Sequence, residues 1–151
     1  MRIRILHVAM FAALGVGSAD PAAAATLPAR EPGLWQSTTT VTGQDGQPIP
    51  KATNIVTVSC VDPATDIKFF TSGDSACSSL AIEGAGGIYT IDGTCTQQGK
   101  PVSIHETLVY ASSRSVTLTA KLDSPMGPVN IASHLQWQGA CLAGMVPGDE
   151  G

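Results

Sequence analysis

The chain is short of charge and of aromatic side chains. Of its 151 residues, only 13% are Asp, Glu, Lys or Arg, and only 5% are Phe, Trp or Tyr. Because an average soluble domain has about 25% charged residues, we exclude a charge-rich helical bundle or coiled coil. The 8 basic side chains are outnumbered by 12 acidic ones, which argues against nucleic acid as a partner. The length suits a single domain, since chains divide into several at roughly 250–300 residues.

Long apolar runs are also missing. The run from Ile5 to Val16 has 12 residues, against about 20 for a membrane-spanning helix. It follows the basic start Met1–Arg4 and leads to Ala22–Ala25, a pattern typical of a secretory signal peptide. We therefore predict that residues 1–25 are removed on export and that residues 26–151 form one domain, without stable membrane insertion. The expected location is the periplasm of a Gram-negative bacterium, or otherwise the medium as a secreted protein.

Removal of the signal peptide makes the chain more acidic. It takes Arg2, Arg4 and Asp20 away, which leaves 6 basic and 11 acidic side chains, a net charge of −5.

Four cysteines remain in the exported part, an even number that predicts two disulfides in an oxidising compartment. They are Cys60, Cys77, Cys95 and Cys141. No two of them have the close spacing of a structural zinc site. Two pairings stay open. Cys77 and Cys95 flank a tight hairpin, but they share a face only if a β-bulge intervenes. The alternative joins Cys60 to Cys77 and Cys95 to Cys141.

Apolar residues alternate with polar ones through most of the exported chain, which predicts seven β-strands. The expected strands are Leu34–Thr42, Thr53–Cys60, Ser79–Glu83, Ile88–Thr96, Val102–Tyr110, Val116–Leu122 and Val129–Trp137. One short helix is expected over Ala64–Phe70, with Asp62 as its N-cap. Short turns between successive strands indicate an all-β antiparallel meander. We predict a small open or closed up-and-down barrel, with a two-sheet sandwich as the alternative.

Motifs for covalent chemistry are absent from the sequence. It contains no Gly-x-Ser-x-Gly, no Ser-x-x-Lys and no Cys beside a His. The alternation places His105 and His134 on the polar face, with Glu106 on the face opposite His105. We therefore expect no enzyme activity, no catalytic residue, no cofactor and no metal site.

The two tryptophans lie at the two ends of the predicted sheet. Trp35 begins the first strand, where it either anchors the core or lines a ligand cavity. Trp137 lies on the apolar face of the last strand. Because the first and last strands of a closed meander approach each other, we predict that Trp35 and Trp137 pair at the seam.

The segment Glu31-Pro32-Gly33-Leu34-Trp35, the spaced cysteines and the ending Gly139–Met145 resemble a family of exported bacterial proteins of unknown function, DUF3617. The resemblance covers residues 30–145. It implies a signal peptide and a Thr- and Met-rich β meander, although the exported part has only Met126 and Met145. Gln36 stands where the family usually has Glu. The family has no established activity, so the resemblance implies no catalytic residues.

Two functions fit these observations. One is a periplasmic binding module that holds a small apolar or amphipathic ligand in a barrel. The other is a structural or interaction module of the cell envelope, which binds an envelope protein through a surface or a sheet edge.

Overall fold

A computed structural model describes residues 25–71, 76–97, 99–124 and 127–149 of the chain. The predicted signal peptide, residues 1–25, lies outside the described residues except for Ala25.

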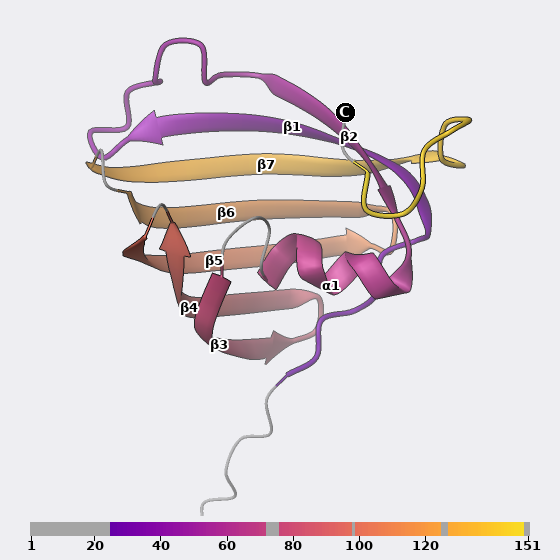
Figure 1. Ribbon diagram of the computed structural model, residues 1–151, viewed down its shortest axis with the longest axis horizontal. Helices are drawn as coiled ribbons and strands as arrows, with labels where there is room; N and C mark the ends of the chain where they lie inside the picture. Colours follow the sequence, from indigo (N-terminus) through magenta and orange to yellow (C-terminus); the bar gives the residue numbers. More distant parts are fainter. Residues whose placement is uncertain (1–24, 72–75, 98, 125–126, 150–151) are drawn as a thin grey trace, which may run out of the picture.

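The described chain folds into seven β-strands and one α-helix (Figure 1). Their bounds are β1 Gly33–Gly43, β2 Ile55–Val61, α1 Pro63–Thr71, β3 Ala76–Ala85, β4 Ile88–Gln97, β5 Lys100–Ser112, β6 Ser115–Ser124 and β7 Gly127–Gly139. Asp62 caps α1, because its Oδ1 accepts hydrogen bonds from the backbone N–H groups of Ala64 and Thr65, both at 2.9 Å. These hydrogen bonds lower the pKa of the Asp62 carboxyl.

All seven strands belong to one antiparallel sheet in the order β2-β1-β7-β6-β5-β4-β3. Strands β3 to β7 follow one another as a meander, and β1 joins it beside β7. The prediction of an all-β antiparallel meander with one short helix is confirmed in the open form. The sheet has β2 and β3 as its two edges, and the alternative of a two-sheet sandwich is wrong.

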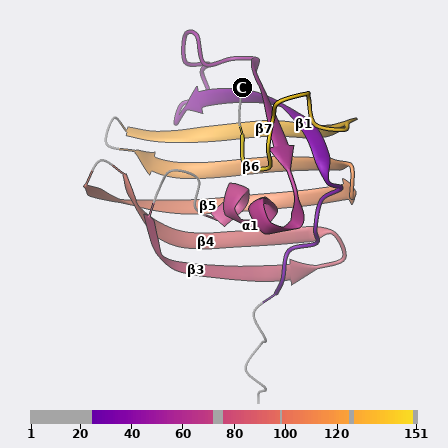
Figure 2. The ribbon, with the colours of Figure 1, turned by 45° about the vertical axis from the view of Figure 1, so that its right-hand side comes forward.

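The sheet curves around α1, which lies against its inner face (Figures 1 and 2). In sequence, α1 connects the two edge strands β2 and β3. The open sheet is therefore stabilised by a helix that buries apolar side chains on one face, rather than by closure of a barrel.

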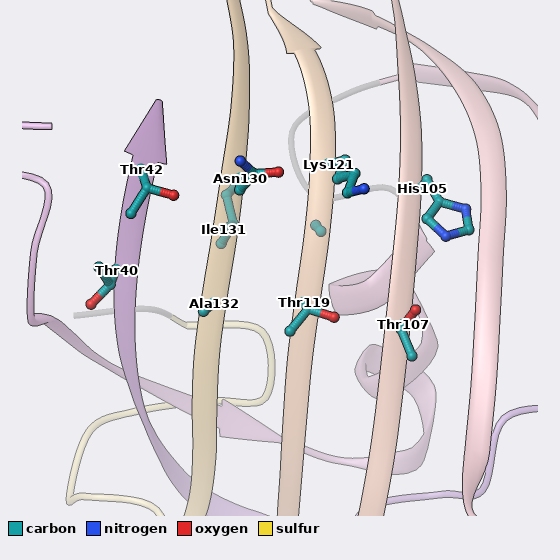
Figure 3. Close-up of a pocket in the computed structure, with 10 residues that line it drawn as sticks. Thr40, Thr42, His105, Thr107, Thr119, Lys121, Asn130, Ile131 and Ala132 are labelled. Carbon is teal, nitrogen blue, oxygen red and sulfur yellow. The ribbon is translucent and has the colours of Figure 1, made fainter. Parts of the chain in front are cut away.

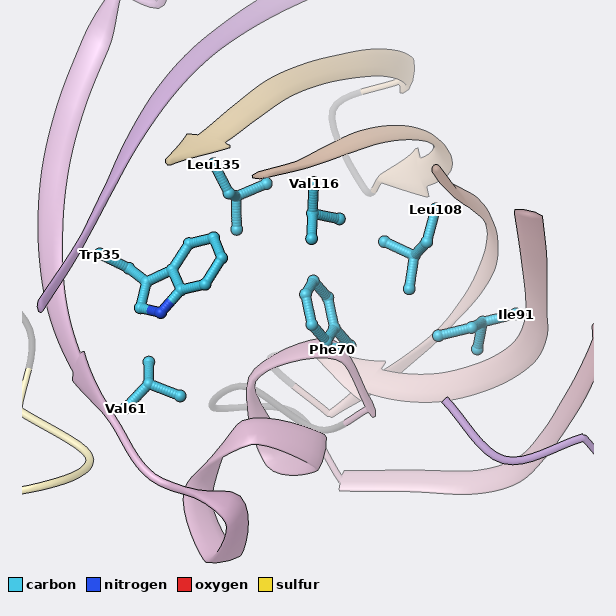
Figure 4. Close-up of a cluster of buried hydrophobic side chains, with 7 residues drawn as sticks. All are labelled: Trp35, Val61, Phe70, Ile91, Leu108, Val116 and Leu135. Carbon is cyan, nitrogen blue, oxygen red and sulfur yellow. The ribbon is translucent and has the colours of Figure 1, made fainter. Parts of the chain in front are cut away.

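The core lies between the inner face of the sheet and α1 (Figure 4). Phe70 projects from α1 into a ring of side chains contributed by six of the strands. These side chains are Trp35, Val61, Ile91, Leu108, Val116 and Leu135, all buried. Tyr110 packs edge-on against Phe70, with ring centroids 6.5 Å apart. Removing such aromatic surface from water stabilises the fold by roughly 25 cal/mol per Å².

A buried ion pair joins the segment before β1 to the helix. Arg30 is 2% exposed, and its Nε donates to Oδ1 of Asp66 at 2.6 Å. The backbone N–H of Arg30 donates to the other carboxylate oxygen at 2.8 Å. The guanidinium lies between the rings of Trp35 and Phe70, 4.7 and 4.6 Å from their centroids. Burial lowers the pKa of Arg30, and the Asp66 carboxylate opposes this shift.

The segments at both ends of the described chain cover parts of the sheet edges. The N–H of Ala25 donates to the carbonyl of Ile82 on β3. On β2, Cys60 donates its N–H to Asp149 and accepts from the N–H of Gly148. Unpaired strand edges invite pairing with other chains, and these contacts occupy backbone groups on each edge.

One predicted turn is shorter in the structure. The expected strands Ser79–Glu83 and Ile88–Thr96 leave residues 84–87 as the turn between them, but β3 continues to Ala85, and Gly86 and Gly87 alone form the hairpin loop. Both have positive φ, 64° and 89°. Two-residue hairpin loops of type I′ need this geometry at both positions, and glycine adopts it without strain.

Candidate functional site

The four cysteines form two disulfides, Cys60–Cys141 and Cys77–Cys95. The alternative pairing of Cys60 with Cys77 and Cys95 with Cys141 is therefore wrong. Cys77 and Cys95 are direct partners on β3 and β4, and the register shifts between Cys77 and Ser79. This bulge brings the two cysteines onto one face, as the sequence required for this pairing. The disulfides indicate a protein of a non-cytoplasmic compartment.

Trp35 and Trp137 are partners across the ladder between β1 and β7. Trp35 is 1% exposed and packs in the core under α1, so it fills space rather than facing an open hollow. Trp137 is half-buried and packs at the border of that core. Their indole N–H groups donate to the carbonyls of Glu31 and Pro32, at 2.8 and 3.0 Å. Both rings therefore hold the segment that leads into β1.

The backbone at position 33, in the segment that leads into β1, requires a glycine. Its φ is +134°, and a Cβ at this position would lie 2.1 Å from the carbonyl oxygen of Gly139 and 2.8 Å from Nε1 of Trp137. Both distances are shorter than a carbon side chain tolerates. The Pro-Gly-Leu-Trp segment is thus a structural joint between β1 and β7, and it brings no chemically reactive group together.

The outer face of the sheet, opposite α1, carries the polar side chains. The strand registers align them into rows that cross the sheet. One row, here called the polar row, contains Thr42, Asn130, Lys121, His105 and Asp92. The adjacent row, here called the small row, contains Thr40, Ala132, Thr119, Thr107 and Thr90.

A hollow of about 420 Å³ lies over these two rows (Figure 3). We call this hollow the groove. The residues of both rows that belong to β1, β5, β6 and β7 line the groove, together with Ala120 and Ile131. In Figure 3, α1 lies beyond the strands, so the groove and the helix are on opposite sides of the sheet. The volume falls within the roughly 300–1,000 Å³ typical of small-molecule sites.

The groove offers a defined set of hydrogen-bonding groups. Nδ1 of His105 lies 2.5 Å from Oδ1 of Asp92, and this contact leaves Nε2 of the imidazole for a ligand. Lys121 lies beside His105 in the register and directs its amine toward it (Figure 3). Nδ2 of Asn130 donates to the carbonyl of Gly43 at 3.3 Å, which fixes the amide. The arrangement can bind a polar group, and methyl groups of the small row can contact an apolar one.

A buried carboxyl occupies the inner face. Glu106 is flanked in the register by Ile91 and Ala120, both buried. Its Oε2 atom is buried and has no hydrogen-bond partner in the described part of the chain. Burial raises the pKa of Glu106 to about 7. Burial likewise raises the pKa of Tyr110 to about 12.

The other predicted features fall on the outer face. His134 is exposed there and pairs with Thr38 and Thr117, away from His105. Within the residues described, no group of three or more His, Cys, Asp or Glu side chains could hold a metal ion. In the same residues, no helix has the length and hydropathy needed to cross a membrane.

Sequence reasoning missed the groove and the Arg30–Asp66 pair. Alternation does place the threonines, Lys121 and His105 on one face, but it does not give the registers that align them. Arg30 precedes the first strand in a segment without periodicity. The sequence does place an acidic residue, Asp66, in the first turn of the helix. A carboxylate at that position is ordinarily explained by its favourable interaction with the helix dipole, so it did not point to a buried ion pair.

Comparison with known proteins gave one match. A family model described as protein of unknown function (DUF3617) matches residues 30–141. No curated protein and no solved structure matches the chain. The matched range begins at the buried Arg30, includes every strand and ends at Cys141, the disulfide partner of Cys60. Because this range is well over half of the chain, and because the structure accounts for its Pro-Gly-Leu-Trp segment and its cysteines, the protein belongs to the DUF3617 family.

Proposed function

We propose that the protein is an exported, non-catalytic binding module of the cell envelope that takes a small amphipathic ligand into the groove. The observation that carries this proposal is the alignment of two unlike rows across four strands. One row offers an amine, an imidazole and an amide, and the other offers methyl and hydroxyl groups. A hollow with a polar side and an apolar side suits a ligand that has both.

The inner side of the sheet supports the same choice of site. Under α1 it is filled by Trp35, Phe70 and their neighbours. Near β1 its hydroxyl groups bond to one another, as Thr39 does to Ser133 at 2.7 Å. A ligand on the inner side would have to displace these contacts, whereas the groove needs no rearrangement.

We assign the groove no reaction. Its His105–Asp92 pair has side chains 53% and 59% exposed. Catalytic electrostatics depend on donors held in a site that excludes water, and this pair is open to solvent. The alternative function, pairing with an envelope protein through a sheet edge, has less support at β2, because Gly148 and Asp149 occupy backbone groups of that edge.

Native mass spectrometry of the protein purified from its own cell envelope tests the proposal. We expect a co-purifying small molecule, and we expect Thr119→Trp to lose it because the indole would fill the groove. Thr117→Trp is the matched control, since Thr117 is exposed on the same face of β6 but does not line the groove. Absence of a ligand from the wild-type protein, or its retention by Thr119→Trp, would contradict the proposal.

The exported state has its own test. The intact mass of the envelope form should correspond to a chain that begins at Thr26, within about two residues. Full-length protein confined to the cytoplasmic fraction would contradict export.

A further inference from the structure

The groove differs in charge from the rest of the molecule. The chain carries a formal charge of −4, yet the ten residues that line the groove include a lysine and a histidine and no carboxylate. Asp92, the last member of the polar row, and Asp123 line a second hollow, which shares Lys121 and His105 with the groove. A ligand in the groove therefore contacts Lys121 and His105, whereas the two carboxylates are not part of its lining.

Lys121 is the cation that this groove offers. The ion pairs of the described residues are Arg30–Asp66, His105–Asp92 and Arg114–Glu31, and none includes Lys121. Its side chain is exposed, and its register partners are His105 and Asn130. The ammonium can thus bind an anion without first giving up an internal carboxylate.

His105 adds a second group that can bind an anion. Nδ1–H donates to Asp92 and so orients the imidazole, and in the imidazolium form the second N–H, on Nε2, can donate to a ligand. Thr107 and Thr119 follow in the adjacent row, and their hydroxyls can donate to the same group. The polar end of the groove consequently presents an amine, an imidazole and hydroxyls to one small head group.

Apolar surface continues from the small row toward β4. Val109 follows Thr107 by two residues on β5, so both side chains are on the outer face, and Val109 pairs with Ile88. The side chains of Val109 and Ile88 are 41% and 56% exposed. An aliphatic chain that leaves the head group, crosses the small row and continues along β5 would reach both.

We propose that the groove recognises the carboxylate or phosphate head group of a single-chain anionic amphiphile, with Lys121 and His105 on the head group and the chain over the small row. The inference rests on the proposed function, because it names the ligand class of the same groove. It assigns roles in binding alone and involves no covalent step.

Titration of the isotope-labelled protein by NMR tests the ligand class. The probes are decyl phosphate, decanoate, decanol and decyltrimethylammonium, each below its micellar concentration. We expect decyl phosphate and decanoate to shift the amide signals of β5, β6 and β7 around the groove. Lys121→Gln should weaken their binding by about tenfold, since a hydrogen bond to a charged group has roughly that effect. Lys100→Gln, an exposed lysine of β5 outside the groove, should leave it unchanged.

The outcomes distinguish failure of the proposed anionic head group from failure of the groove as a binding site. Equal binding of decanol or decyltrimethylammonium in the groove would overturn the anionic head group and leave the binding function standing. No shift around the groove with any probe would overturn both. Co-sedimentation with phosphatidylglycerol vesicles distinguishes a bilayer from a free amphiphile as the source of the anion. For whichever source binds, Lys121→Gln should reduce the binding.

Discussion

Glu106 combines an ionisable group with an apolar position on the inner face. Because its folded pKa of about 7 lies above the ordinary value of 4.5, the folded protein binds this proton more tightly than the unfolded chain. Its contribution to the free energy of unfolding is therefore complete below about pH 4.5 and is lost as the pH rises to about 7. At 1.36 kcal/mol per pKa unit, and allowing for the solvent that reaches a half-buried side chain, the loss is roughly 2–3 kcal/mol.

Glu106→Gln should remove this loss, because glutamine cannot ionise. Urea unfolding at pH 5 and pH 8 measures it, and the wild-type protein should lose more stability between the two values than the variant. Glu83→Gln is the control, since Glu83 is exposed on β3. If Glu106→Gln keeps the full pH dependence of the wild type, the carboxyl is not the group responsible.

The helix α1 is attached to the sheet through side chains of one buried cluster. Asp66 is 5% exposed, and it accepts from both the backbone and the guanidinium of Arg30. Asp66→Asn should destabilise the protein by about 3–5 kcal/mol, because the buried Arg30 charge would lose the Asp66 carboxylate. Glu31→Gln breaks the exposed Arg114–Glu31 pair and should cost at most about 1 kcal/mol. Thermal and urea unfolding give both values.

A double variant distinguishes loss of the pair from a general defect in packing. Arg30→Met combined with Asp66→Leu removes both charges and keeps apolar volume, so it should be more stable than Asp66→Asn. The opposite order would mean that Asp66 acts through the helix itself and not through Arg30.

The strands and the helix could be predicted from the sequence because alternation and capping are local signals. The pattern around Leu118 and the Asp62–Pro63 start of α1 needed no tertiary information. The bulge that joins Cys77 to Cys95 could be stated as a condition for their pairing. The sequence did not locate it, because the stretch Cys77-Ser78-Ser79 has no apolar alternation whose phase could show the inserted residue. The buried Arg30 was hidden because its partner is 36 residues away.

The candidate site depended still more on long-range structure. Alternation predicted that His105 faces outward. It did not predict that Lys121 would lie between Asn130 and His105, because that row exists through the pairing of three separate strands. The register of each strand pair is set by burial of the apolar side chains on the inner face of the sheet. Packing of the core therefore determines which residues line the groove on the outer face.

The whole molecule is an open sheet whose edge strands are contacted by residues near both ends of the described chain. In a closed barrel, the two edge strands would pair with each other, and their backbone N–H and C=O groups would be hydrogen-bonded. Here a few edge groups are hydrogen-bonded instead by Ala25, which contacts Ile82 on β3, and by Gly148 and Asp149, which contact Cys60 on β2. The C-terminal segment is held covalently, since Cys141 bonds to Cys60 on β2. The two disulfides therefore connect different parts of the structure. Cys77–Cys95 joins two strands of one hairpin, and Cys60–Cys141 joins β2 to the distant C-terminal segment.

This difference predicts unequal effects on stability. The Cys60–Cys141 bond spans 81 residues and the Cys77–Cys95 bond spans 18. In the chain-entropy model, the longer loop contributes about 4.5 kcal/mol and the shorter about 3 kcal/mol. We expect the variant with Cys60→Ser and Cys141→Ser to unfold at a lower urea concentration than the variant with Cys77→Ser and Cys95→Ser.

In the variant that lacks the Cys60–Cys141 bond, the C-terminal segment should also detach from β2. Its hydrogen bonds to residue 60 are few, and a short segment that is not cross-linked to the sheet opens at little cost in free energy. Hydrogen exchange measures that step, through faster exchange at Gly148 and at the Cys60→Ser amide, while the hairpin of β3 and β4 stays protected. Continued protection of Gly148 in this variant would show that the segment is held by its own contacts and that the disulfide acts on the unfolded chain alone.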